Sequence, residues 1–299
     1  MRITTKMIKM DSITSLQENM RRLSEIQEKL SAGKMIVRPS DDPVLTARSM
    51  DLTRSLNDIE QYQKNVEDNV SWLDYTDTAL NNLTSVLQRA RELTVKGANG
   101  TMPEDSLKAI SSEVEQLMDH VISIGNTTYG GRYIFAGFKT IGDKPFEQGE
   151  AYKGDNGQMT REVSPGVSMS INVTGQEAFI DSGIFDGSNV GQGVFNDLMT
   201  ALENGDQDAV GGPILEKIDG ALDKILSLRA KMGARSHRME LTKGRWEEAK
   251  INTTQLLSGF QDVDVAEMVM KLKTEENVYQ TALAAVARTI QPTLINFLN

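Results

Sequence analysis

The sequence has no cysteine among its 299 residues, so neither disulfide bonds nor thiolate chemistry can contribute to it. The longest alanine and aliphatic run near its C-terminus, residues 282–287, falls far below the roughly 20 residues that span a bilayer. Residues 1–10 include basic side chains but lack the apolar segment of a cleavable secretory signal. We therefore expect a chain stabilised by packing alone, which stays in the cytoplasm or is exported without a signal peptide.

Clustered positive charge and catalytic motifs are also missing. The formal net charge is -10 with a pI of about 4.9, which argues against nucleic acid and against an anionic membrane surface. His120 and His237 fall on predicted helices without a second histidine nearby, which argues against a zinc site. With no Ser/His/Asp order and no phosphate-binding loop, we expect no enzyme activity, no cofactor and no metal.

The most regular stretch of the sequence lies between residues 43 and 96. One apolar column repeats there every seven residues: Leu45, Leu52, Ile59, Val66, Leu73, Leu80 and Leu87. The companion column, four residues on, is mixed and includes Asp77, Thr84 and Arg91. A strict seven-residue repeat needs a partner helix that wraps with it as a coiled coil. At 1.5 Å per residue this helix would reach roughly 80 Å, which predicts a helical rod.

A second heptad segment, residues 214–260, supplies the partner. Its apolar column is Ile218, Ile225, Met232, Met239, Trp246 and Phe260. Its companion column is polar, with Arg229, Ser236, Lys243 and Lys250. One apolar column on each segment favours a shared helical bundle over an independent symmetric dimer. The two apolar columns form the predicted rod seam.

Both ends of the sequence carry narrower apolar stripes. Residues 7–30 place Ile13, Leu16, Met20 and Leu23 three and four apart, and after an interruption at Gln27 the stripe resumes at Leu30. Residues 262–299 carry Val265, Val269, Leu272, Tyr279, Leu283, Val286, Ile290, Leu294 and Phe297. Apolar side chains this close to a chain end would be exposed to water without a partner. We therefore predict that these residues form a subunit or partner interface.

Capping residues predict where three helices begin. Asp42 can cap a helix whose first position is Pro43, and Asp264 can cap the last helix. Thr101 and Glu104 have the spacing of a capping box, which predicts a helix from there to about residue 124.

Helical periodicity disappears from residue 125 to residue 193, where glycine is concentrated. Val167, Met169, Ile171 and Val173 alternate with polar residues, which indicates a half-buried strand, and residues 155–157 offer a turn before it. The prediction is a mainly α chain with an inserted β-rich domain at 129–212. A helical rod would comprise 43–128 and 213–261, and a terminal helical domain 1–42 and 262–299.

Several motifs resemble a known family. Leu-Ser-Ala-Gly-Lys at 30–34 and Arg-Pro-Ser-Asp-Asp-Pro at 38–43 resemble the N-terminal signature of the flagellin superfamily, in the form carried by the hook-associated protein 3 family. Gly-Arg-Tyr-Ile-Phe-Ala-Gly at 131–137 and Tyr-Lys-Gly-Asp at 152–155 are similar to markers of that family and are not expected in flagellin. Residues 262–267 and 295–298 resemble its C-terminal region.

The resemblance implies a structural subunit at the distal junction between the hook and the filament of the bacterial flagellum. Its partners would be hook-associated protein 1, flagellin, further copies of itself in a ring, and a flagellar export chaperone that holds the C-terminal helix. Export through the flagellar type III apparatus would place it outside the cell without a signal peptide. The alternatives are a flagellin filament subunit and a cytoplasmic signalling coiled coil, but the latter does not account for the inserted β-rich region.

Overall fold

The computed structural model describes residues 5–290. The helices are α1 (Thr5–Ala32), α2 (Pro43–Gly97), α3 (Glu104–Gly125), α4 (Val194–Glu203), α5 (Gln207–Ala209), α6 (Leu215–Gln261) and α7 (Val265–Ile290). The chain divides into two compact units: unit 1 comprises 1–59 and 248–299, and unit 2 comprises 60–247. The predicted class, long helices at both ends of the sequence around a strand-containing segment, is confirmed.

The strand-containing segment holds two small antiparallel sheets. β1 (Thr128–Tyr129) pairs with β2 (Arg132–Tyr133), and β3 (Thr160–Ser164) pairs with β4 (Val167–Ser170). Two π-helical turns, η1 (Gln176–Ile180) and η2 (Val210–Ile214), lie in the rest of the segment and at the start of α6. The strand expected from Val167 is therefore present but ends at Ser170.

The turn expected at residues 155–157 is not the hairpin turn. The hairpin turns at Pro165 and Gly166, where Gly166 has φ of +71°, a conformation that glycine adopts without the steric cost of a Cβ. Asp155 has another role, because its carboxylate accepts hydrogen bonds from the Phe138 amide at 2.7 Å and the Gly157 amide at 2.9 Å.

Two of the three predicted helix caps are confirmed. The Asp42 carboxylate accepts from the amides of Val44 and Leu45, both at 3.0 Å. The Asp264 carboxylate accepts from those of Ala266 at 2.9 Å and Glu267 at 3.2 Å.

The capping box proposed for α3 is wrong. Pro103 occupies the N-cap position without a side-chain cap. The Thr101 hydroxyl instead donates to the Asn99 side chain at 3.1 Å, so a local turn uses the group that the helix end would have needed.

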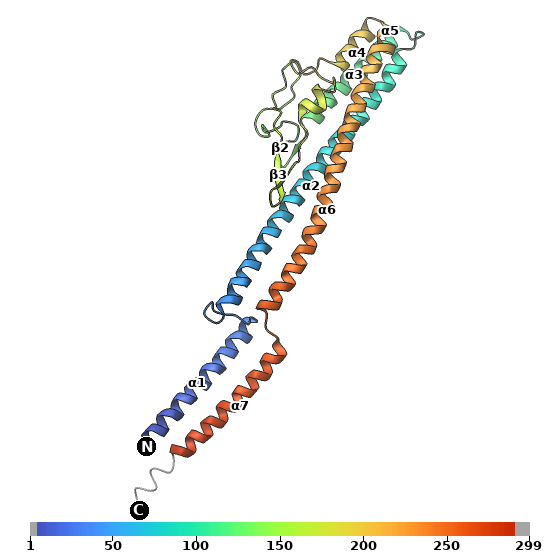
Figure 1. Ribbon diagram of the computed structural model, residues 1–299. Helices are drawn as coiled ribbons and strands as arrows, with labels where there is room; N and C mark the ends of the chain where they lie inside the picture. The colour runs from blue at the N-terminus through green and yellow to red at the C-terminus, as the bar shows by residue number, and fades with distance from the viewer. Residues whose placement is uncertain (1–4, 291–299) are drawn as a thin grey trace, which may run out of the picture. The chain divides into compact units, whose positions relative to one another are not determined.

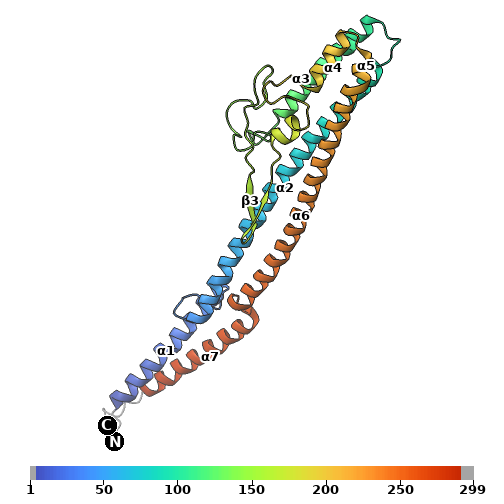
Figure 2. The same cartoon turned by 45° about the horizontal axis from the view of Figure 1, so that its top comes forward.

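The core of unit 2 runs from the helices into the inserted segment without a break. Leu73, Leu80 and Leu87 of α2 belong to the same buried cluster as Phe135, Phe146 and Phe179. The inserted segment lies against the unit 2 part of α2, and α3 lies beside α4 (Figures 1 and 2). Burial of apolar surface is the main stabilising contribution here.

In unit 1, α1 and α7 lie side by side as two helices (Figures 1 and 2). The segment that follows α1 is joined to the end of α6 by the Met35 amide, which donates to the Gln261 carbonyl at 2.7 Å. Gly33 directly follows the last residue of α1 and has φ of +66°, the left-handed conformation in which a glycine commonly ends a helix. Among residues 5–290, no helix is both long and apolar enough to cross a membrane.

Candidate assembly surfaces

The predicted rod seam is buried where it lies in unit 2. Val66, Leu73, Leu80, Leu87, Ile218, Ile225, Met232 and Met239 are all at most 2% exposed, and Trp246 is half-buried. Of the remaining seam residues, all in unit 1, Ile59 is buried, whereas Leu45, Leu52 and Phe260 are half-buried. The Arg48 guanidinium lies 5.1 Å from the centre of the Phe260 ring.

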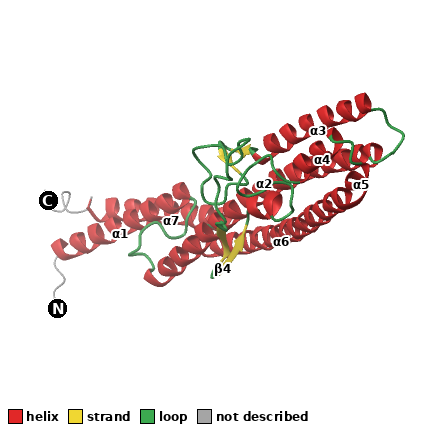
Figure 3. Cartoon of the chain, turned by 90° about the horizontal axis from the view of Figure 1, so that it is seen from above, coloured by secondary structure: helices red, strands yellow, loops and turns green. Residues whose placement is uncertain are grey.

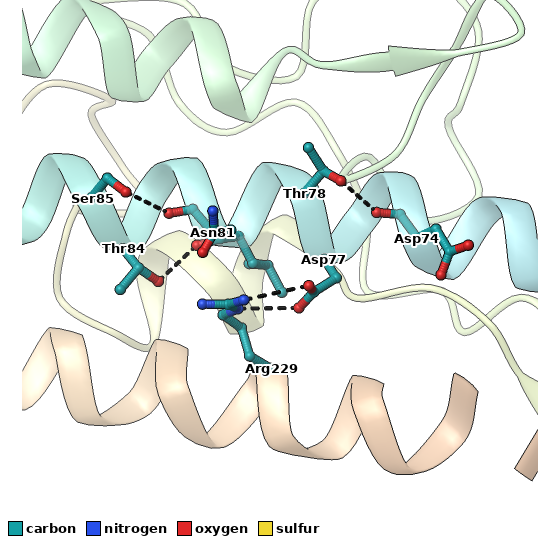
Figure 4. A network of polar contacts seen from close by, with 8 residues as sticks. Asp74, Asp77, Thr78, Asn81, Thr84, Ser85 and Arg229 are labelled. Carbon is teal, nitrogen blue, oxygen red and sulfur yellow. Dashed lines mark hydrogen bonds and ion pairs between the residues drawn. The ribbon is translucent and has the colours of Figure 1, made fainter. Parts of the chain in front are cut away.

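Charged residues of the polar companion columns form ion pairs between α2 and α6. Arg229 of α6 reaches across to Asp77 of α2, with Nε 3.1 Å from Oδ1 (Figure 4). Lys243 pairs with Glu67 at 3.1 Å, and Arg91 of α2 pairs with Asp219 of α6 at 2.6 Å. These partly exposed pairs each contribute little free energy. Their effect is on register, because an axial shift of one helix would separate all three pairs.

Hydroxyl side chains on this part of α2, among them Thr84 of the companion column, bond back to the backbone of their own helix. Thr84 is buried, and its hydroxyl donates to the Leu80 carbonyl at 2.8 Å. Thr78 and Ser85 donate in the same way to the carbonyls of Asp74 and Asn81 (Figure 4). A buried hydroxyl that bonds back to its own helix leaves no polar group unsatisfied, so the column can be polar and still pack.

The β3–β4 hairpin is held on the two long helices by side-chain hydrogen bonds. The Trp246 indole Nε1 donates to the Val163 carbonyl at 2.8 Å, and Asn65 Nδ2 of α2 donates to the Glu162 carbonyl at 3.1 Å. Arg245 donates to the Ser164 hydroxyl at 2.6 Å. The Trp246 ring also stacks on Tyr62 of α2, with centroids 5.2 Å apart. Trp246 therefore links both helices and the hairpin.

The two motifs of the inserted segment, 131–137 and 152–155, interlock. The Tyr152 hydroxyl donates to the Phe135 carbonyl at 2.6 Å, and the Asp155 amide donates to the Ala136 carbonyl at 3.1 Å. Gly137 has φ of +68°, and a Cβ there would lie 2.1 Å from the Asp155 carboxylate. Because no side chain fits this approach, the glycine and the aspartate depend on each other.

Burial gives Tyr152 a distinctive titration. Loss of solvent around the phenol raises the pKa of Tyr152 to about 12, since the charged phenolate would be poorly solvated. Nearby, the Lys153 ammonium lies 2.8 Å from Glu147 and 2.5 Å from Glu150. Hydrogen bonding to Lys153 holds the pKa of Glu147 below its usual value. These groups order the loop and are not arranged as acid and base around a reacting centre.

Unit 1 leaves much of the predicted interface accessible. Ile13, Met20, Val265, Val269 and Leu283 are exposed, whereas Leu16, Leu23, Leu30, Leu272, Tyr279 and Val286 are half-buried. The side chain of Ile290 is not described, and Leu294 and Phe297 lie outside the described residues. Exposed apolar side chains in rows on paired helices are typical of an assembly surface. The interface itself stays a prediction.

Some structural residues were missed from the sequence. Met268 of α7 is buried at 7% exposure, although it lies outside the predicted stripe, and Asn19 of α1 is a buried polar residue. Arg22 donates to Asn19 and pairs with Glu275 of α7 at 3.4 Å. The spacing of Met268 between Val265 and Leu272 was a usable signal, whereas no pattern identified Asn19. Across residues 5–290 no group of three potential metal-ligating side chains comes together.

Comparisons with known proteins agree with this architecture. The bacterial flagellin N-terminal helical region matches residues 3–140, and the bacterial flagellin C-terminal helical region matches residues 215–298. The chain is 27% identical to flagellar hook-associated protein 3 of Escherichia coli K12 over 282 residues, which cover 88% of this chain and 89% of that protein. It is also 27% identical to flagellin of Bacillus subtilis 168 over 300 residues, 97% of each chain.

A solved structure shows the same fold. The crystal structure of Bacillus cereus FlgL is 28% identical and matches with a TM-score of 0.60, covering 70% of this chain and 99% of that one. The long paired helices and the two matched regions define a flagellar structural protein. The chain belongs to the flagellin family, and its resemblance to hook-associated protein 3 is confirmed.

Proposed function

We propose that this chain is the junction subunit that joins the flagellar hook, through hook-associated protein 1, to the flagellin filament. The observation that carries the proposal is the interlock of residues 131–137 with 152–155. These two motifs resemble hook-associated protein 3 rather than flagellin, and the Tyr152–Phe135 and Asp155–Ala136 hydrogen bonds make them one structural feature. Two motifs that depend on each other in the structure support the resemblance more strongly than two unrelated short motifs would.

The exposed apolar rows of α1 and α7 support the assembly part of the proposal. Met20 and Val265, at 58% and 59% exposure, would be costly to leave in water on a permanently free chain. In the junction they would contact neighbouring copies in a ring, hook-associated protein 1 on one side and flagellin on the other. An export chaperone would cover the C-terminal helix before assembly, during export through the type III apparatus.

A junction subunit must prefer its unlike neighbours along the axis over further copies of itself. The test mixes the purified chain with hooks that already carry hook-associated protein 1. We expect a short cap, visible by electron microscopy, that then accepts flagellin. Under conditions that polymerise flagellin, the chain alone should remain monomeric or form small oligomers. Long filaments of the chain alone would refute the junction assignment.

The second candidate is a flagellin filament subunit. The match to Bacillus subtilis flagellin over 97% of both chains favours it, because identity alone does not separate the two roles. A deletion strain discriminates between them. Loss of a junction subunit should leave hooks without filaments and release flagellin into the medium, whereas loss of the filament subunit should remove the flagellin itself.

A further inference from the structure

The side of α6 that faces away from the buried column in unit 2 carries an exposed leucine and, three residues on, a glycine. Leu241 is 64% exposed there. A Cβ added at Gly244 would have open space around it. Glycine in a helix interior is destabilising relative to alanine, and no close contact within the described chain requires glycine at this position. A second helix that approached this side closely would pack against both residues.

Unpaired positive charge borders this surface. Lys231 and Arg238 are exposed and have no acidic partner within residues 5–290. Most other cations of α6 are engaged: Lys217 with Asp197, Arg229 with Asp77, and Lys243 with Glu67. The outer face of α6 is defined here as Leu241 and Gly244, with Lys231 and Arg238 along one edge. A partner for this face should be a helix with small and acidic side chains.

The outer face of α3 has that chemistry. Asp105, Ser112 and Asp119 are exposed on one side of the helix, seven residues apart, and the exposed Glu115 lies beside them. In the described part of the chain, neither Glu115 nor Asp119 forms an ion pair, whereas Glu113 is paired with Arg89 at 2.7 Å. Ser112 leaves the backbone of α3 accessible between the acidic residues.

The two faces lie on opposite sides of unit 2. Figure 3 shows α3 and α6 at opposite edges, with α2 and α4 between them. One molecule therefore cannot join its own two faces, but the α6 face of one copy can reach the α3 face of the next. A contact between two different surfaces of identical chains repeats from copy to copy and closes into a ring when the rotation allows.

We propose that the outer face of α6 binds the outer face of α3 on a second copy of this chain. Lys231 and Arg238 face Glu115 and Asp119 across the contact, Leu241 packs over Ser112, and Gly244 allows the helices to approach closely. The contact rests on the proposed function, because it gives the junction ring its lateral bond. Charge complementarity fixes the pairing of α6 with α3 in preference to α6 with α6.

Cysteine cross-linking tests the contact directly, because the natural chain has no cysteine. Leu241→Cys and Ser112→Cys are made as separate full-length variants and mixed, both as concentrated purified chain and on hooks bearing hook-associated protein 1. Oxidation should give a dimer that contains one chain of each variant. The control is Gln88→Cys, at an exposed site of α2 outside both faces. It takes the place of one of the two cysteine variants in the mixture.

Charge reversal gives an independent measurement on the same protein. Lys231→Glu with Arg238→Glu should weaken self-association about tenfold, since two attractions become repulsions. Combining it with Glu115→Lys and Asp119→Lys should restore the association. Lys96→Glu with Lys144→Glu changes the net charge equally at exposed positions outside both faces and should leave association unchanged.

The outcomes separate this contact from the proposed function. A mixed dimer in either preparation, together with rescue by the fourfold charge swap, supports the contact. Absence of the mixed dimer from both preparations, or a cross-linked product that contains another flagellar protein in place of a second copy, overturns it. Failure of the proposed function would give a different result: microscopy would never find the wild-type chain at the ends of hooks.

Discussion

Replacement of Trp246 by phenylalanine tests how the hairpin is held on the helices. The change keeps an aromatic ring against Tyr62 but removes the indole N–H that donates to the Val163 carbonyl at 2.8 Å. Val163 is only 2% exposed, so its carbonyl would be left without a donor in a place that water reaches poorly. Leaving a buried acceptor unpaired costs about 1–3 kcal/mol. We expect Trp246→Phe to lower the free energy of unfolding by about 2 kcal/mol.

The chain contains its own control, because it has two tryptophans. Trp72 is buried like Val163, but its indole N–H has no hydrogen-bond partner among the described residues. Trp72→Phe therefore loses ring volume without losing a hydrogen bond and should cost about 1 kcal/mol. Urea unfolding followed by far-ultraviolet circular dichroism measures both variants, with the fluorescence of the remaining tryptophan reporting on unit 2. Equal costs for the two variants would refute the argument that the Trp246 hydrogen bond holds the hairpin.

Three further predictions concern unit 2. Gly137→Ala should lower the free energy of unfolding by about 2 kcal/mol or more, measured by thermal unfolding, because its Cβ would overlap Asp155. Gly131→Ala, where φ is +77° but the space is open, should lower it by about 1 kcal/mol. Equal costs would contradict the interlock. Because the pKa of Tyr152 is raised by burial, its stabilising effect is complete below pH 10 and is lost as pH rises toward about 12, so Tyr152→Phe should unfold with a weaker pH dependence across that range. Leu80→Ala should cost about 3 kcal/mol, and the exposed Leu226→Ala less than about 0.5 kcal/mol, with denaturant midpoints as the readout.

The heptad columns could be predicted from the sequence because burial follows their period. Leu73, Leu80 and Leu87 recur every seven residues, and the structure buries all three. The meaning of the polar companion columns could not be predicted in the same way. Asp77 and Arg229 look like gaps in two separate seams until the helices are aligned, and then they form a cross-helix ion pair. Pairing between distant segments depends on how the two helices are aligned, and the repeat within one segment does not show that alignment.

The inserted segment shows the opposite balance. Its existence and the strand from Val167 could be read from glycine content and alternation, but the hairpin turn was assigned to the wrong residues. Asp155 and Gly157 have good turn chemistry, yet tertiary contacts with Phe138 use that chemistry elsewhere. Pro165 and Gly166 have equally good turn chemistry and provide the turn. Local propensity alone could not choose between two suitable turns ten residues apart.

The distribution of exposed apolar residues links this stability to assembly. In unit 2, α6 and the inserted segment cover the apolar column of α2. Trp246 and its neighbours therefore stabilise a core that is buried within the single chain. In unit 1 the pairing of α1 with α7 buries Met268 but leaves Met20 and Val265 in water. In a pair of helices, each helix can bury only the side that faces the other. Apolar residues outside that side need a third neighbour to be buried. A substitution in the unit 2 core should therefore change the stability of the free chain, whereas one at Met20 or Val265 should change assembly with little effect on unfolding.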